Sequence, residues 1–229
     1  MTLSRRHLLL AGTAGPLLAS CATYLSRYQN DSVPTLATRL GVCQAVFARL
    51  KAGQALAPTA ITGCSADAAG RADAVFQAAS LTKPVVAWGA LRLTRSGHLD
   101  LEAPISHYLR QGYTHYHSAL RRSPGDPSDT VPIDTLARIP VATLLNHTSG
   151  LPNWTSNKLA AAFDPGSRWQ YSGEGYVLRQ AVIEAVTGMP ISQFMDEQVF
   201  KPLGMRDSGL VWQDRFADQV VHGESATGV

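Results

Sequence analysis

Apolar residues recur at two different spacings along the chain and predict both strands and helices. Residues 42–50 and 57–64 are strand-like apolar runs on either side of a turn-prone segment that contains Gly53, which predicts a β-hairpin. Over residues 80–96 the apolar positions follow an approximate helical period, and Gly97 is typical of a helix end. The pattern therefore predicts an early hairpin followed by a helix.

The rest of the pattern is mostly helical. Four more segments are expected to form helices or parts of helices: residues 35–40, 141–147, 175–187 and 191–203. Residues 74–79 are strand-like, whereas residues 121–132 contain three prolines and one glycine and predict a surface loop. The length allows one or two domains, and no internal repeat, heptad run or linker that would divide independent domains is present.

Composition narrows the class of protein. The 229 residues are 45% hydrophobic and 16% charged, which is typical of a globular chain rather than a disordered or collagen-like one. The net charge of +3 falls to +1 without the two arginines in the first twenty residues, so no nucleic-acid partner is expected. The 7 histidines, of which His115 and His117 are the closest pair, lack the H-E-x-x-H spacing of metal sites, and we expect no metal and no cofactor.

The first segment has the features of an export signal. Residues 1–20 open with Arg5 and Arg6, continue through an apolar run and end on small residues before Cys21. The apolar run is far shorter than the roughly 20 residues of a spanning helix. The arginine pair resembles a twin-arginine signal and residues 18–21 resemble a bacterial lipobox, so we expect a protein of the bacterial periplasm or cell envelope, anchored to the membrane by a lipid at Cys21. The alternatives are an ordinary positive n-region and an unmodified Cys21.

Two further cysteines lie in the predicted hairpin. With the turn centred on Gly53 and Gln54, Cys43 and Cys64 fall opposite one another, so a disulfide between them is geometrically conceivable in an oxidising compartment. Two buried free thiols are an equal alternative, because few strand pairs suit disulfide geometry and bulges shift the register.

A serine and a lysine stand at the start of the predicted helix over residues 80–96. Ser80 and Lys83 are three positions apart, so on a helix they share one face and the ammonium can reach the hydroxyl. A lysine can activate a serine when burial or nearby cations lower its pKa. The Ser80 N–H, unpaired at a helix start, would point at an acyl oxyanion. The S-x-x-K pattern is common by chance, and its alternative is a capping serine followed by a solvated lysine.

Five segments in order carry a family resemblance. Residues 76–84 resemble the nucleophile segment of the serine beta-lactamase and penicillin-binding-protein superfamily, closest to class C beta-lactamases, D-alanyl-D-alanine carboxypeptidases and related esterases. Four further landmarks follow: residues 97–105, 144–152, 165–176 and 202–208. The resemblance runs from about residue 42 to about residue 210. It implies an α+β fold of the beta-lactamase/DD-peptidase type, in which a mostly helical region accompanies an antiparallel sheet.

The resemblance also implies roles for three residues. Ser80 would be the acylated nucleophile, Lys83 its general base or electrostatic partner, and Tyr171 the phenol that moves protons between serine, substrate and leaving group. Without the family, Tyr171 is interpreted as a packed aromatic residue. The function implied is that of a serine hydrolase acting through an acyl-enzyme on a beta-lactam, a D-alanyl peptide or an ester, so the expected partner is a small-molecule or peptidoglycan-like substrate.

Two features depart from the family pattern. Its usual Tyr-x-Asn triplet is here Tyr171-Ser172-Gly173, and no Lys-Thr-Gly or His-x-Gly triplet follows on a late strand before Val229. We therefore expect residues 21–229 to be the N-terminal and helical part of a C-terminally truncated domain that keeps only the N-terminal hairpin of the sheet; the alternative is a natural short variant. The functional alternative is a non-catalytic or inactive envelope lipoprotein that binds peptidoglycan-like ligands or a partner.

Overall fold

The computed structural model describes residues 28–62, 71–118 and 121–222. The chain forms two compact units, Met1–Phe76 with Asp218–Val229 and Gln77–Ala217, whose boundaries fall where the sequence has no linker pattern. Among the described residues no helix is long and apolar enough to cross a membrane. Each unit is described by itself.

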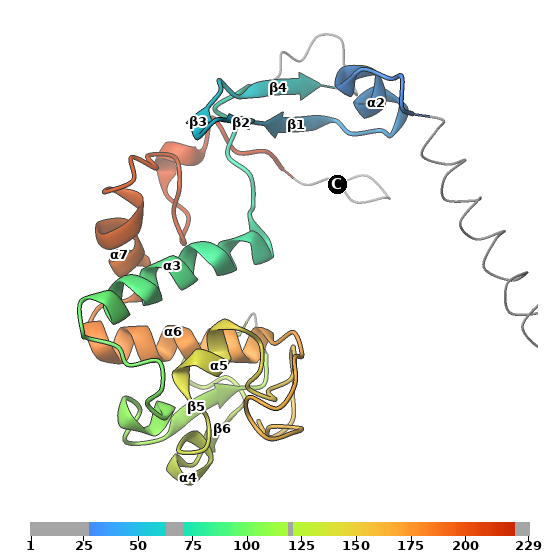
Figure 1. Ribbon diagram of the computed structural model, residues 1–229. Helices are drawn as coiled ribbons and strands as arrows, with labels where there is room; N and C mark the ends of the chain where they lie inside the picture. The colour runs from blue at the N-terminus through green and yellow to red at the C-terminus, as the bar shows by residue number, and fades with distance from the viewer. Residues whose placement is uncertain (1–27, 63–70, 119–120, 223–229) are drawn as a thin grey trace, which may run out of the picture. The chain divides into compact units, whose positions relative to one another are not determined.

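The first unit contains the predicted hairpin. Helix α2 (Val33–Arg39) begins after Ser32, whose Oγ accepts a hydrogen bond from the Thr35 N–H. Two short antiparallel ladders then follow, strand β1 (Gln44–Phe47) with β4 (Thr59–Thr62) and strand β2 (Leu50–Lys51) with β3 (Gln54–Ala55) (Figure 1). The leading helix and the hairpin are therefore confirmed.

The register of the hairpin differs from the prediction by one residue. The turn is centred on Ala52 and Gly53, with φ of 49° and 78°, and β1 pairs Gln44 with Thr62. Between the two ladders residues 56–58 oppose only residues 48–49, and Pro58 has no N–H to donate, which is typical of a bulge. The turn expected at Gly53 and Gln54 is therefore wrong, and so is the register counted from it over residues 44–62.

The cysteine prediction is only partly within the described residues. Cys43 is disulfide-bonded, which excludes a free thiol at this position. Cys21 and Cys64 lie outside the described residues, so the pairing of Cys43 with Cys64 stays a prediction. The strand expected over residues 74–79 is wrong, because within it only Val75 forms a bridge, to Val220, and Ala79 already begins a 3₁₀ turn.

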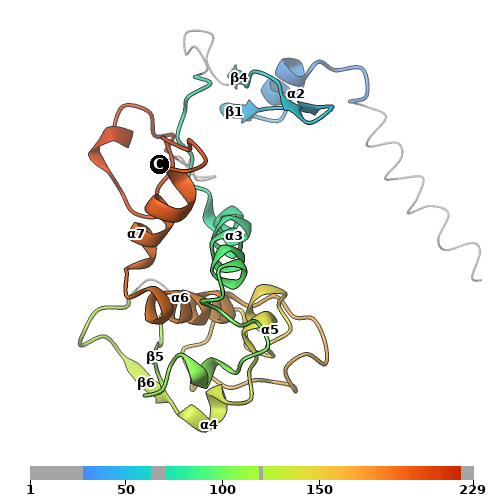
Figure 2. The ribbon, with the colours of Figure 1, turned by 60° about the vertical axis from the view of Figure 1, so that its left-hand side comes forward.

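The helices of the second unit form around one apolar core (Figures 1 and 2). They are α3 (Thr82–Arg95), α4 (Ile133–Leu136), α5 (Val141–Leu145), α6 (Gly173–Thr187) and α7 (Ile191–Met195). Short helical turns add Ala79–Leu81, Ile105–His107, Asp196–Phe200 and Asp214–Phe216. Ala90, Leu178, Val182 and Met195 are fully buried and join α3, α6 and α7. The helices expected over residues 80–96, 141–147 and 175–187 are confirmed in place, and that over residues 191–203 is an α-helix only as far as Met195, followed by a π-helical turn to Phe200.

A second hairpin lies in the second unit, where the sequence predicted a loop. Strand β5 (Tyr113–Tyr116) pairs antiparallel with β6 (Ser128–Val131), and both views show the hairpin beneath α6 (Figures 1 and 2). Tyr113 and Val131 face each other and are buried in the core. This packing stabilises a strand whose polar sequence does not indicate one, so the loop predicted over residues 121–132 is corrected at 128–131.

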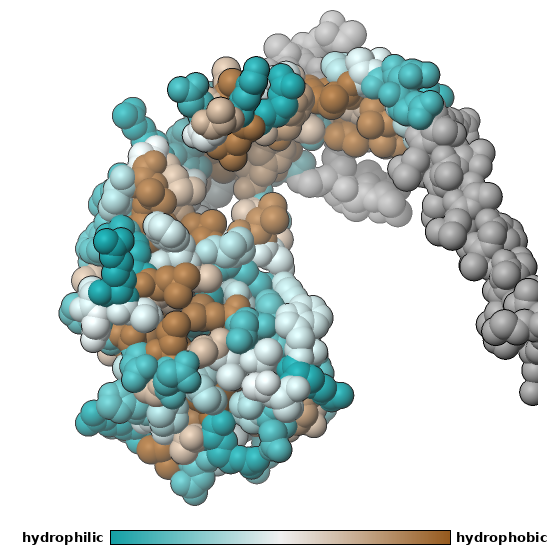
Figure 3. Space-filling view, in the orientation of Figure 1, coloured by the Kyte–Doolittle hydropathy of each residue, from teal (hydrophilic) through white to brown (hydrophobic). Residues whose placement is uncertain are grey.

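Helix α3 buries one face and leaves another open. Val86, Gly89 and Ala90 face the core, whereas Leu81 and Trp88 are 76% and 50% exposed. In the space-filling view hydrophobic residues gather over the helices of the second unit (Figure 3). Apolar surface therefore lies beside the first turn of this helix.

Candidate active site

Ser80 occupies the junction between a 3₁₀ turn and helix α3. It is the second residue of the turn Ala79–Leu81, and α3 begins at Thr82. Ala79 has φ of 43°, a left-handed conformation that is uncommon for a residue with a side chain. This backbone shape presents Ser80 at the exposed start of the helix, where the first N–H groups have no acceptor inside the helix.

Two donors converge on the hydroxyl oxygen of Ser80. Lys83, one turn further along, donates from Nζ to Ser80 Oγ at 3.0 Å. The Tyr171 hydroxyl, from a segment 91 residues away in the sequence, donates to the same oxygen at 2.8 Å. The structure therefore brings together all three side chains that the sequence selected, within the second unit.

The charge of Lys83 acts on the phenol. Its Nζ lies 5.1 Å from the ring centroid of Tyr171 and 5.4 Å from that of Tyr176. Hydrogen bonding with Lys83, and then with Ser80, holds the pKa of Tyr171 below its usual value near 10. A phenol with a lowered pKa reaches the phenolate form closer to neutral pH, and it can then take a proton from Ser80.

His147 holds Tyr171 in place, although the sequence gave it no role. Its ring stacks on Tyr171 at 4.5 Å and on Tyr176 at 4.9 Å between centroids. Its carbonyl accepts from Gln170 N at 2.8 Å and its Nδ1 accepts from Ser172 N at 3.1 Å, so it binds the backbone on both sides of Tyr171. Burial, and then the charges of Lys83 and Arg179, lower its pKa. The signal for this residue was its place in the landmark over residues 144–152.

Gly173, the departure from Tyr-x-Asn, lies where a side chain does not fit. A Cβ built at this position would lie 2.5 Å from the backbone oxygen of Asn153 and 2.6 Å from the Trp154 ring. The Gly173 N–H donates to Asn153 Oδ1 at 3.1 Å. Neighbouring chain therefore fills the space in which the usual asparagine side chain would begin.

An open hollow lies beside Lys83. It has a volume of about 560 Å³ and is lined by residues of α3 and α6, among them Tyr176 and Arg179, by Trp154 and by segments that follow α6. Arg179 is 2% exposed, its Nε and Nη1 have no hydrogen-bond partner, and its guanidinium lies 3.8 Å from the Tyr176 ring centroid. Burial lowers the pKa of Arg179 to about 10, so it is still a cation at neutral pH. The hollow thus combines apolar walls with a buried positive charge.

Not every predicted site residue falls within the described residues. Cys21, the expected site of lipid attachment, lies outside them, and so does Cys64. Three other potential ligands, His115, His117 and Asp129, lie close together, and they are considered in a later subsection.

Comparison with known proteins gives the family. The family model described as Beta-lactamase matches residues 52–228. Esterase EstB of Burkholderia gladioli is 36% identical over 171 residues, which are 62% of this chain and 40% of the esterase. Penicillin-binding protein 4* of Bacillus subtilis is 31% identical over 161 residues, 60% of this chain and 31% of that protein. The chain thus spans less than half the length of these relatives.

Solved structures agree on the fold. A class C beta lactamase superimposes with a TM-score of 0.63 at 18% identity, over 85% of this chain and 53% of the other. The D-amino acid amidase of Ochrobactrum anthropi has a TM-score of 0.54 at 27% identity, over 73% of this chain and 48% of the amidase. The α+β fold of the beta-lactamase/DD-peptidase type is therefore confirmed. Because the family model covers most of the sequence, the chain belongs to the beta-lactamase family.

Proposed function

We propose that the protein is a serine hydrolase that forms an acyl-enzyme at Ser80. The observation that carries this proposal is the convergence of Lys83 Nζ and the Tyr171 hydroxyl on Ser80 Oγ, at 3.0 and 2.8 Å. A nucleophilic hydroxyl needs a neighbouring group that accepts its proton, and both candidates lie within reach. Membership of the beta-lactamase family supports the same reaction class.

The reaction proceeds in two steps. Tyr171, as a phenolate stabilised by the charge of Lys83, accepts the Ser80 proton while Oγ bonds to the substrate carbonyl carbon. The bond to the leaving group breaks, and the leaving group takes the proton from Tyr171. In the second step Tyr171 accepts a proton from water, whose oxygen attacks the acyl-enzyme, and Ser80 Oγ takes that proton as the acid leaves.

The residues around Ser80 favour one class of substrate over the others. A beta-lactam, a D-alanyl peptide or an ester presents the carbonyl that this step requires. Among these an ester is favoured, because Gly173 offers no side-chain amide to bind a substrate amide and because EstB, a relative at 36% identity, is an esterase. The partly apolar hollow beside Lys83 suits the acyl group.

The location of the protein is a separate proposal. Arg5, Arg6 and the lipobox-like residues 18–21 support export to the bacterial envelope and lipid attachment at Cys21. Mass spectrometry of the protein from its native membrane fraction would test this. A new N-terminal Cys21 that carries acyl chains is the expected result, and an unmodified Met1 or Ser20 at the N-terminus would contradict it.

The function is tested by the burst of p-nitrophenol that accompanies acylation. The full chain, its Ser80→Ala variant and the control Ser167→Ala are mixed with p-nitrophenyl butyrate, and in parallel with a chromogenic cephalosporin and a D-alanyl-D-alanine peptide. Ser167 is exposed in the segment before Tyr171. We expect a burst of one p-nitrophenol per chain from wild type and Ser167→Ala, and background release from Ser80→Ala.

Two results would contradict the proposal. One is an equal burst from Ser80→Ala, and the other is the absence of a burst and of any adduct from the folded chain with all three substrates. Binding of the peptide without an adduct would instead favour the alternative, a non-catalytic envelope lipoprotein.

A further inference from the structure

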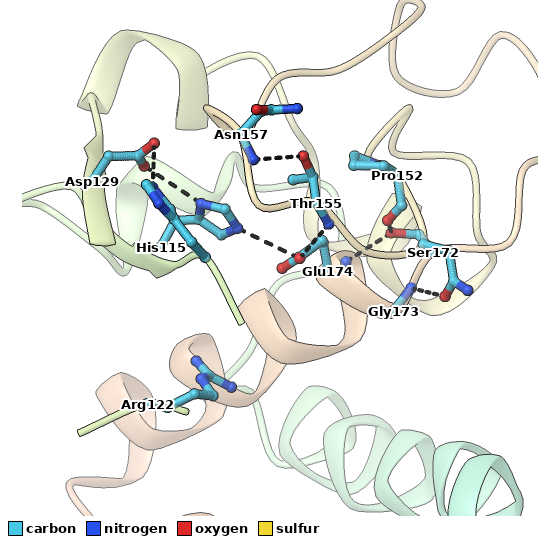
Figure 4. A network of polar contacts seen from close by, with 12 residues as sticks. His115, Arg122, Asp129, Pro152, Thr155, Asn157, Ser172, Gly173 and Glu174 are labelled. Atoms are coloured by element: carbon cyan, nitrogen blue, oxygen red, sulfur yellow. Dashed lines mark hydrogen bonds and ion pairs between the residues drawn. The ribbon is translucent and has the colours of Figure 1, made fainter. Parts of the chain in front are cut away.

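A second polar cluster lies in the second unit, between the β5–β6 hairpin and the start of α6 (Figure 4). His115 on β5 pairs with Asp129, directly opposite on β6. His117 follows two residues after His115, and residues two apart on an extended chain point to the same side. Glu174, in the first turn of α6, faces His115 from the other side. Four ionisable side chains from three elements therefore meet at one place.

Three polar atoms of this cluster have no hydrogen-bond partner among the described residues. His115 is 1% exposed, and neither of its ring nitrogens has a hydrogen-bond partner; the same holds for Asp129 Oδ1. A buried polar group without a partner is costly, and native structures contain few of them. These buried polar atoms therefore indicate a site that binds a ligand.

The spacing of the polar atoms fits a metal ion. His115 Nδ1 lies 3.5 Å from Asp129 Oδ1, and His117 Nε2 lies 3.4 Å from Asp129 Oδ2. One ligand atom from each of the three residues lies within 4.8 Å of the others. Ligand atoms at about 2.0 Å from a tetrahedral Zn²⁺ are about 3.3 Å apart, so small side-chain adjustments would complete a site.

We propose that His115, His117 and Asp129 bind a divalent transition-metal ion of the Zn²⁺ class. Two imidazoles and one carboxylate are the ligand types that this ion prefers in proteins, and three protein ligands leave a fourth position for water. The H-E-x-x-H search along the sequence missed this set because its members come from two paired strands.

Glu174 faces the ring nitrogen of His115 that points away from Asp129. Its Oε1 lies 3.4 Å from His115 Nε2 and accepts a hydrogen bond from the Thr155 N–H at 3.2 Å. With an ion bound, this carboxylate would accept a hydrogen bond from Nε2–H of His115 and so leave the Nδ1 lone pair on the side of Asp129. Such a partner behind a ligating histidine is a usual feature of zinc sites.

An ion can reach the cluster from solvent. The side chains of His117 and Asp129 are 32% and 23% exposed, whereas that of His115 lies at the buried end. Asp129 also lines an open hollow of about 490 Å³ together with residues 158–165. The proposed site therefore has a route of entry.

The proposed ion would stabilise the segment that carries Tyr171 and would take no part in the reaction itself. It would tie β5 and β6 to the first turn of α6 through Glu174, and Glu174 is three residues after Tyr171. The competing occupant of the cluster is a proton, with His115 as an imidazolium between the carboxylates of Asp129 and Glu174. The experiment has to separate these two.

Cobalt supplies a readout that does not depend on activity. The full chain, stripped with a chelator, is titrated with Co²⁺ and followed by its visible absorption, and Zn²⁺ is then added to displace it. The variants are His117→Gln, Asp129→Asn and Glu174→Gln, with His107→Gln as the control, since His107 is exposed and outside the cluster. Circular dichroism before metal addition verifies the fold of each.

We expect wild type and His107→Gln to bind one Co²⁺ per chain and to be stabilised against heat by Zn²⁺. The affinity should fall by about 100-fold or more for His117→Gln and Asp129→Asn, and by about 10 to 100-fold for Glu174→Gln. Folded wild type without a cobalt spectrum and without a thermal shift would overturn the proposal in favour of the proton. Unchanged binding by a folded His117→Gln or Asp129→Asn would also overturn it, because the ion would then be bound elsewhere.

Discussion

The second unit contains two polar clusters that differ in exposure and in whether their polar atoms have hydrogen-bond partners. At the start of α3 Ser80 is exposed, and its Oγ accepts hydrogen bonds from two neighbouring side chains. Between β5 and β6 His115 is 1% exposed and neither ring nitrogen has a partner. Reactive groups at a surface can satisfy one another and still be open to a substrate, whereas buried groups without partners indicate a ligand that completes them.

The two clusters share one short segment. Tyr171 reaches Ser80, and three residues later Glu174 faces His115. Between them Ser172 caps α6 by accepting a hydrogen bond from the Gly175 N–H, and Gly173 packs on Asn153. A substitution confined to one cluster should therefore change either acylation or metal binding alone. A substitution in the shared segment should change both.

Loss of Lys83 is the change with the largest expected effect on the exposed cluster alone. Lys83→Met removes the donor to Ser80 Oγ and the cation beside the Tyr171 phenol, so acylation by p-nitrophenyl butyrate should slow by about 10³-fold or more. Stopped-flow measurement of the burst rate tests this. The control Lys201→Met, at an exposed position, should keep the wild-type rate. A Lys83→Met rate within tenfold of wild type would show that Lys83 is not needed.

Loss of the Tyr171 hydroxyl should have the next largest effect. Tyr171→Phe should slow acylation by about 10² to 10³-fold, because no phenolate accepts the Ser80 proton. The pH dependence of the acylation rate gives a second test of this role. Since the phenolate fraction rises with pH, the wild-type rate should rise through a pKa below 10, and Tyr171→Phe should lose this rise. An unchanged pH profile in a folded Tyr171→Phe variant would assign the base to another group.

The shared segment is tested at Gly173. Gly173→Ala places a Cβ 2.5 Å from the Asn153 backbone oxygen, which is too close, and should lower the free energy of unfolding by about 1 to 3 kcal/mol. It should also weaken both acylation and metal binding. Urea denaturation gives the stability, and Ser167→Ala, an exposed substitution nearby, should stay within about 0.5 kcal/mol of wild type. A Gly173→Ala protein as stable as wild type would show that Asn153 and Trp154 yield easily.

Arg179 gives the smallest expected effect and a contrast with His115. Both are buried with unpartnered nitrogens, but Arg179 lies on the Tyr176 ring and forms no ion pair among the described residues, whereas His115 faces two carboxylates. Burial lowers the pKa of Arg179 to about 10, so the folding cost of its charge is fully present below pH 10 and fades as the pH rises above that value toward the ordinary pKa of arginine. Arg179→Met should therefore raise the free energy of unfolding by about 1 kcal/mol at pH 7. A loss of stability in urea denaturation would instead indicate that the contact with Tyr176 outweighs the burial of charge.

The fold was predictable from sequence where local signals agree with the packing. Gly97 and the apolar spacing over residues 80–96 defined α3, and the positive-φ turn at Gly53 marked the hairpin. Strand β6 was missed because its sequence is polar and its stability depends on pairing with β5 and on the burial of Tyr113 and Val131. The hairpin register was missed because the turn is centred on Ala52 and Gly53 rather than on Gly53 and Gln54, and the extra residue of the bulge near Pro58 offsets only part of this shift.

The site was predictable to a similar extent. Ser80 and Lys83 followed from helix geometry, and Tyr171 followed from the family resemblance alone. His147 was missed because its role depends on stacking between two tyrosines, which no spacing encodes. The cluster at His115 was missed because its members meet only through strand pairing.

The central claim is that Ser80 is the one residue that the exposed cluster makes reactive. Intact-mass and peptide analysis of the full chain after treatment with a fluorophosphonate tests it most directly, with Ser80→Ala and Tyr171→Phe in parallel. We expect a single adduct on Ser80, formed more slowly in Tyr171→Phe and absent from Ser80→Ala. An adduct on another residue, or none on the folded wild-type chain, would contradict it.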